Sequence, residues 1–114
     1  MNGNNCFYEI ERRGETLRII LNGEMDHHNA VAVRTELDSL IAEERPAKFA
    51  IDLSGVGFMD SSGLGFVMGR YSLIQKLGGE FVLENPNDRI MKIFELAGLG
   101  RMIRIESTKK EDVK

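Results

Sequence analysis

The stretch Met59-Asp60-Ser61-Ser62-Gly63-Leu64-Gly65-Phe66 decides the fold, because it joins a strand pattern to a helix pattern. The residues before it, Phe49-Ala50-Ile51-Asp52-Leu53, form a short apolar run of the β type. The residues after it predict a helix from about Ser62 to Leu77, with apolar side chains three and four positions apart: Leu64, Val67, Met68, Tyr71 and Ile74. Ser61 therefore falls where a helix N-cap is expected.

A serine hydroxyl at an exposed helix N-terminus can cap the helix, accept a phosphoryl group or act as a nucleophile. The nucleophile reading has some support, because Ser61 with His27 or His28 and Asp26 or Asp60 supplies every residue type of a hydrolase triad. The local sequence, however, does not fit the Gly-x-Ser-x-Gly turn of such enzymes. The pattern favours a binding module over an enzyme, and the residues alone leave the cap and the phosphoacceptor open.

Strand and helix patterns alternate along the rest of the chain. The first two strands should form a hairpin, and the later ones should be mostly parallel because helical crossovers separate them. This order predicts a single α/β domain over residues 1–114, with a mixed sheet of about four to five strands, a core over about 7–106 and loosely ordered termini. We expect strands at Phe7–Arg12, Thr16–Leu21, Phe49–Leu53, Phe81–Leu83 and Met102–Ile105, a loop at Asn22–Glu24, and helices at Asn29–Glu44, Ser62–Leu77 and after Asn85-Pro86-Asn87 with Ile90, Ile93, Phe94 and Ala97 inward.

Composition narrows the classes of function. The chain has 114 residues and a net charge of −3, with its basic residues scattered, so the sequence carries no footprint for nucleic acid. Its one cysteine, Cys6, cannot form an internal disulfide or a cysteine metal cluster. We expect a cytoplasmic protein without a membrane span, a signal peptide or a cofactor. A glycine loop with lysine for binding phosphate is absent, so any ATP would come from a partner.

Several segments together resemble a known family. Asp52-Leu53-Ser54 and Phe58–Gly65 resemble the signature of STAS domains, named for sulfate transporters and anti-sigma factor antagonists, and Leu21–His28 is similar to the second marked loop of that family. The likeness covers about Thr16 to Ile105. The segments Glu24–His28 and Asp60–Tyr71 are especially similar to the anti-sigma factor antagonist (anti-anti-sigma factor) of endospore formers.

The resemblance implies a switch operated by phosphorylation. In that family the unphosphorylated protein binds an anti-sigma factor that is also its serine kinase, and this binding releases the sigma factor. Phosphorylation breaks the complex, and a separate phosphoserine phosphatase resets it. The acceptor serine of the family directly follows the aspartate, so it corresponds to Ser61 and not to Ser62. The implied role is positive regulation of sporulation transcription in the sigma-F pathway. The alternative is a STAS module of a stress-signalling or transporter-associated complex.

The implied partner surface combines two loops. The loop after the second strand and the loop after the third both end at parallel neighbours, so they should open on the same face of the molecule. We expect the partner to bind there, at Asp26, His27, Asp60, Ser61, Ser62, Gly63 and Leu64.

Overall fold

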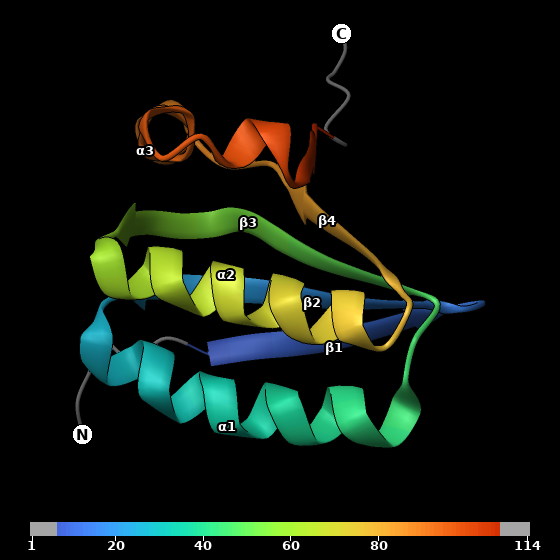
Figure 1. Ribbon diagram of the computed structural model, residues 1–114. Coiled ribbons are helices and arrows are strands. Elements are labelled where there is room, and N and C mark those ends of the chain that lie inside the picture. The colour runs from blue at the N-terminus through green and yellow to red at the C-terminus, as the bar shows by residue number, and fades with distance from the viewer. Residues whose placement is uncertain (1–6, 108–114) are drawn as a thin grey trace, which may run out of the picture.

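The computed structural model describes residues 7–107, which form one α/β layer structure (Figure 1). Its single mixed sheet has the order β1-β2-β3-β4-β5; β1 is antiparallel to β2, and the other neighbours are parallel. The predicted fold class, hairpin and five strands are confirmed. The expectation of loose termini concerns residues 1–6 and 108–114, which lie outside the described part. The elements are β1 Phe7–Arg13, β2 Thr16–Met25, α1 His27–Glu44, β3 Lys48–Met59, α2 Ser61–Lys76, β4 Glu80–Glu84, α3 Asp88–Leu96, the 3-10 turn Leu99–Arg101 and β5 Arg104–Glu106.

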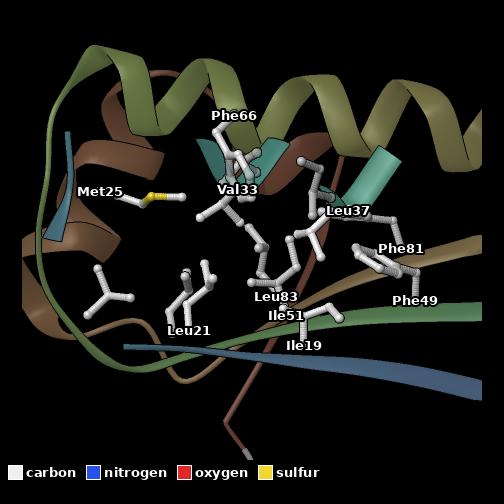
Figure 2. Packing of buried hydrophobic residues seen from close by; sticks show 14 of the residues in the cluster. Ile19, Leu21, Met25, Val33, Leu37, Phe49, Ile51, Phe66, Phe81 and Leu83 are labelled. Atoms are coloured by element: carbon white, nitrogen blue, oxygen red, sulfur yellow. The ribbon is translucent and has the colours of Figure 1, made fainter. Parts of the chain in front are cut away.

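The core lies between the sheet and the helices α1 and α2, which run side by side along one face (Figure 1). Alternate residues of β2 point into it, as a strand with one buried face requires. Figure 2 shows how strand and helix side chains interdigitate in this layer. The buried residues of this layer include Ile19, Leu21, Met25, Val33, Leu37, Phe49, Ile51, Phe66, Phe81 and Leu83. Within residues 7–107, no helix is long and apolar enough to cross a bilayer.

The short helix α3 adds two side chains to the core. In Figure 1, β3 runs between α2 and α3. Ile90 and Phe94 of α3 are fully buried, whereas Ala97 is exposed. The prediction that Ala97 points inward is therefore wrong. The helix ends at Leu96 and Ala97 is its C-cap, so the helical period no longer governs where that side chain points.

Two strands extend well beyond the predicted ends. The expected loop at Asn22–Glu24 is part of β2, and β3 continues past Leu53 to Met59. Shifts in the pairing of β2 with β3 absorb the turn-type residues, as β-bulges do. A Cβ at Gly55 would lie 2.8 Å from the carbonyl oxygen of Leu21, so glycine marks a close approach of two strands and not a turn.

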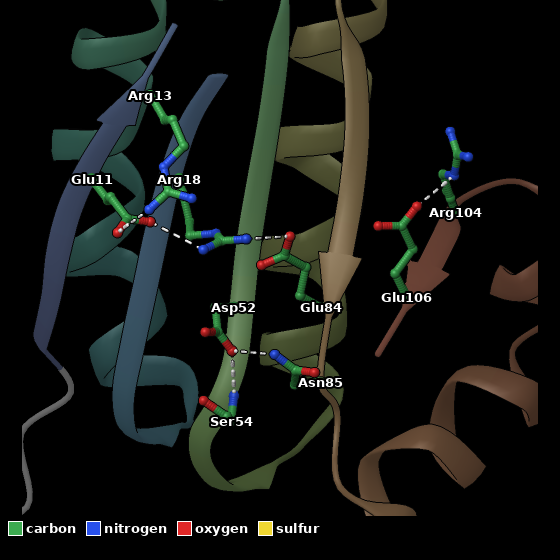
Figure 3. A network of polar contacts seen from close by, with 9 residues as sticks. All are labelled: Glu11, Arg13, Arg18, Asp52, Ser54, Glu84, Asn85, Arg104 and Glu106. Carbon is green, nitrogen blue, oxygen red and sulfur yellow. Dashed lines mark hydrogen bonds and ion pairs between the residues drawn. The ribbon is translucent and has the colours of Figure 1, made fainter. Parts of the chain in front are cut away.

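The sheet face away from α1 and α2 carries a polar network (Figure 3). Arg18 of β2 donates to Glu11 of β1 at 3.0 Å and to Glu84 of β4 at 2.9 Å. Asp52 of β3 accepts from the Ser54 amide at 2.9 Å and from Asn85 Nδ2 at 3.2 Å. Glu84 is almost wholly buried, and a buried carboxylate needs such a partner.

Candidate functional site

Two helices begin at the same edge of the sheet. Met25 and Met59 are register partners on the adjacent parallel strands β2 and β3, and both side chains are buried. Helix α1 starts two residues after Met25, and α2 starts two residues after Met59. Asp26 and Ser61 therefore lie at one end of the sheet, as predicted from the parallel order of the strands.

Asp60 is the N-cap of α2. Its Oδ1 accepts hydrogen bonds from the Ser62 amide at 2.8 Å and the Gly63 amide at 3.2 Å. The prediction that Ser61 is the N-cap is wrong, because the extended backbone of Asp60 places its carboxylate over the first turn. Ser61 is the first helical residue and is exposed, and its hydroxyl makes no hydrogen bond within residues 7–107. Because Asp60 supplies the cap, the hydroxyl of Ser61 remains exposed to solvent.

Asp26 has the same function at the start of α1. Its Oδ1 accepts from the Asn29 amide at 3.0 Å, so α1 begins at His27 and not at the predicted Asn29. The buried Asn29 in turn donates from Nδ2 to the Glu24 carbonyl at 2.8 Å, which ties the helix start to the strand end. The role of Asn29 was not predicted, because it depends on a contact with the strand end that the local sequence does not specify.

His27 and Ser62 join the two helix starts. His27 Nδ1 and Ser62 Oγ lie 3.5 Å apart, and His27 is exposed. Among residues 7–107, no histidine approaches the hydroxyl of Ser61 to hydrogen-bond distance. The arrangement of a catalytic triad around Ser61 is therefore not present in the described residues.

Gly63 lies beneath this surface. It is buried, and a Cβ there would lie 2.3 Å from Met59 Cγ and 2.9 Å from the Met25 carbonyl oxygen. Gly63 thus allows α2 to start directly against the two strand ends. Leu64 is half-buried and packs against the core, whereas a Cβ at Gly65 would meet no atom within 4 Å. Gly63, one of the predicted partner-binding residues, is therefore buried and serves the packing of α2 against the strands.

Two arginines that were not predicted lie beside this surface. A groove between α1 and α2 is lined by Arg34 and Arg70 together with His27 and Ser62. The positions are separated widely in the sequence, so only the packing of the two helices brings them together. The sequence does contain one indication of this groove. Gly65 and Gly69 lie four residues apart in a helix, so they leave one helix face without side chains.

Residues 8–111 match the family model of the STAS domain, and the chain belongs to this family. The anti-sigma F factor antagonist of Paenibacillus polymyxa is 35% identical over 101 residues, which cover 89% of this chain and 86% of the relative. The anti-sigma-B factor antagonist of Bacillus subtilis is 31% identical over 103 residues, 90% of this chain and 93% of the relative.

Solved structures show the same fold. The unphosphorylated form of the anti-sigma factor antagonist SpoIIAA superposes with a TM-score of 0.79 at 30% identity, covering 92% of this chain and 90% of that one. The phosphorylated form of the Bacillus cell fate determinant SpoIIAA superposes with a TM-score of 0.74, also at 30% identity, covering 92% and 94%.

Proposed function

We propose that this protein is an anti-sigma factor antagonist whose binding to its partner is switched off by phosphorylation of Ser61. The observation that carries the proposal is the exposed hydroxyl of Ser61. Because Asp60 caps α2, this hydroxyl is not needed as a cap. Its relatives support the class, since those from Paenibacillus polymyxa and Bacillus subtilis are both named as antagonists of anti-sigma factors.

The partner surface of the proposal is formed by the two helix starts. Asp26 and His27 come from α1, and Asp60, Ser61 and Ser62 come from α2. The partner is an anti-sigma factor with serine kinase activity, which supplies the ATP and the catalytic groups. A phosphoserine phosphatase restores the hydroxyl.

Electrostatics explain how one phosphoryl group controls binding. The group adds a charge of about −1.5 to −2 at neutral pH. In the free protein this charge faces water at a helix N-terminus, where the helix dipole favours it. In the complex it would be desolvated against a surface that fits a hydroxyl, at a cost of several kcal/mol. The solved phosphorylated form of SpoIIAA retains this fold, which agrees with a switch that acts on binding.

The sporulation pathway is the first candidate. The anti-sigma F relative is 35% identical, and anti-sigma-B relatives reach 33% identity, so we take sigma-F as the first candidate by a small margin and keep the stress pathway as the second. Transcription assays with each reconstituted pair of anti-sigma and sigma factors distinguish them. Release of a sigma-F-type factor alone is expected, and release of only a sigma-B-type factor would reverse the assignment.

Phosphopeptide mass spectrometry tests the acceptor. After incubation with the anti-sigma kinase and ATP, we expect phosphate on Ser61 in the unmodified protein and in Ser62→Ala, and none in Ser61→Ala. Ser61→Ala should still bind the kinase and act as a permanent antagonist. Ser61→Asp should fold normally but bind the kinase poorly. Phosphate on Ser62 or Thr16, with Ser61 unmodified, would refute the assignment.

Substitutions that preserve the caps test the surface. Asp26 caps α1, so Asp26→Ala would mix a loss of stability with any loss of binding. Asp26→Asn keeps a capping oxygen and removes the charge, and it should weaken kinase binding with little change in melting temperature. Unchanged binding by Asp26→Asn and by His27→Ala would remove the α1 start from the proposed surface.

A further inference from the structure

A groove of about 270 Å³ lies between α1 and α2, beside the two helix starts. Arg34 and Arg70 supply its charge, and Val31 supplies apolar surface, whereas Phe66 lines it with only 3% of its surface exposed. No aspartate or glutamate lines it. Because His27 and Ser62 also line it, the groove is continuous with the proposed partner surface.

Arg70 is an incompletely compensated buried cation. It is only 5% exposed, and its guanidinium lies 5.3 Å from the centre of the Phe66 ring. Its Nε lies 2.8 Å from Asp38 Oδ1, but its buried Nη1 has no hydrogen-bond partner within residues 7–107. Burial lowers the pKa of Arg70, Asp38 opposes this change, and the nearby positive charge of Arg34 adds to it. An anion in the groove would be attracted by the positive charge of Arg70.

Arg34 adds a second positive charge to the same groove. It is exposed, and it forms no ion pair within residues 7–107. Asp38, the carboxylate that pairs with Arg70, has a side chain that is 39% exposed. The groove carries an excess of positive charge in a protein whose net charge is −3.

The α2 side of the groove is open. Gly65 and Gly69 line it, and a Cβ at either position would meet no atom within 4 Å. Val31 on the α1 side is 40% exposed, so it offers apolar surface beside the two arginines. The groove thus offers both an anion site and apolar contact within one concave surface.

We propose that this groove receives an aspartate or glutamate side chain of the anti-sigma partner, together with an apolar neighbour of that residue. The inference rests on the proposed function and extends it, because it assigns an acidic docking element to the partner. Charge complementarity carries it: a guanidinium fork matches a carboxylate, and the exposed Val31 matches the apolar neighbour.

Charge reversal with a matched control tests the anion site. Arg34→Glu should weaken binding of the unphosphorylated protein to the kinase about tenfold, with the loss growing as salt is lowered. Arg89→Glu makes the same charge change on an exposed residue of α3, away from the groove, and should change binding less than about twofold. Equal binding by the two variants would overturn the proposal.

Filling the groove gives an independent test without a change in charge. Gly69→Leu places a side chain in open space and should weaken kinase binding at least about tenfold while the melting temperature does not fall. Gly100→Leu, at another position where a Cβ meets no atom within 4 Å, is the control and should bind normally. Normal binding by Gly69→Leu would overturn the assignment.

The outcomes separate this inference from the proposed function. If the unmodified protein does not bind the kinase, the proposed function fails. If it binds and both groove variants bind as their controls do, only the groove assignment fails. Titration of inorganic phosphate, followed by the amide signals of Gly65 and Gly69 in NMR spectra, identifies the other occupant. Saturable shifts together with normal kinase binding by both groove variants would assign the groove to a free anion and overturn the proposal.

Discussion

At the scale of single residues, Asp60 stabilises the start of α2 and leaves Ser61 free. We expect Asp60→Ala to lower the free energy of unfolding by about 1 kcal/mol, because the amides of Ser62 and Gly63 lose their acceptor. Asp60→Asn retains a capping oxygen and should stay within about 0.5 kcal/mol of the unmodified protein. Urea unfolding measures both. A larger loss for Asp60→Asn than for Asp60→Ala would contradict the capping role.

Two glycines of α2 should respond in opposite directions to alanine. Gly63→Ala forces a methyl group against Met59 and the Met25 carbonyl oxygen, and it should destabilise the protein by about 1–3 kcal/mol. Gly65→Ala meets open space and should stabilise it by up to about 1 kcal/mol through helix propensity. Thermal melts of the pair provide the measurement. Equal melting temperatures would mean that the helix start relaxes around the added methyl group.

At the scale of elements, Tyr8 ties β1 to α1. Its hydroxyl donates to Glu36 at 2.6 Å, and this hydrogen bond, followed by burial and by the charge of Glu36, raises the pKa of Tyr8 to about 12. The folded pKa lies above the usual value of about 10, so the stabilisation is complete below pH 10 and is lost as the pH rises toward 12.

Tyr8→Phe should therefore cost about 0.5–1 kcal/mol at neutral pH, where the hydrogen bond is intact. The difference from the unmodified protein should shrink between about pH 10 and 12. Urea unfolding across this range, with Glu36→Gln as a companion variant, is the measurement. A difference that grows with pH would show that the tyrosine is stabilised by another contact.

The type and order of the helices and strands could be predicted from the sequence, because they depend on local apolar periods and on helical crossovers. The 3-10 turn Leu99–Arg101 was not predicted, and the last strand begins at Arg104 and not at the expected Met102. The lengths of β2 and β3 could not be predicted. Gly23, Gly55 and Gly57 are typical of turns, yet here they lie within strands that bulge and approach each other closely. Tertiary pairing overrode the local signal.

The candidate site also has features that the sequence predicts and features that it does not. The juxtaposition of Asp26 and Ser61 follows from parallel strand order and was predicted. The identity of the cap was not, because Asp60 and Ser61 are both good capping residues and only the backbone angles of Asp60 distinguish them. The groove at Arg34 and Arg70 depends on the packing of one helix against another, which no local pattern specifies.

At the scale of the whole molecule, we expect phosphorylation of Ser61 to leave the fold intact. The charge lies at a helix N-terminus in water, so stability should change by less than about 1 kcal/mol, a few degrees of melting temperature. Kinase binding should fall by much more, because only the complex desolvates the charge.

Melting curves and kinase titrations on both forms measure these two effects, with Ser61→Asp as a matched negative charge. Loss of the cooperative melt on phosphorylation would mean that the switch works by unfolding the antagonist, and the account based on desolvation would fail.

The pairing of Met25 with Met59 has a consequence for timing. Main-chain hydrogen bonds between the neighbouring strands β2 and β3 fix the spacing of the helix starts, so the surface is complete as soon as the chain has folded. If Ser61 is the acceptor, as proposed, we expect its phosphorylation to need no prior rearrangement of this surface. The rate of the proposed switch would then depend on the activities of its kinase and phosphatase, and not on a slow change of shape in this protein.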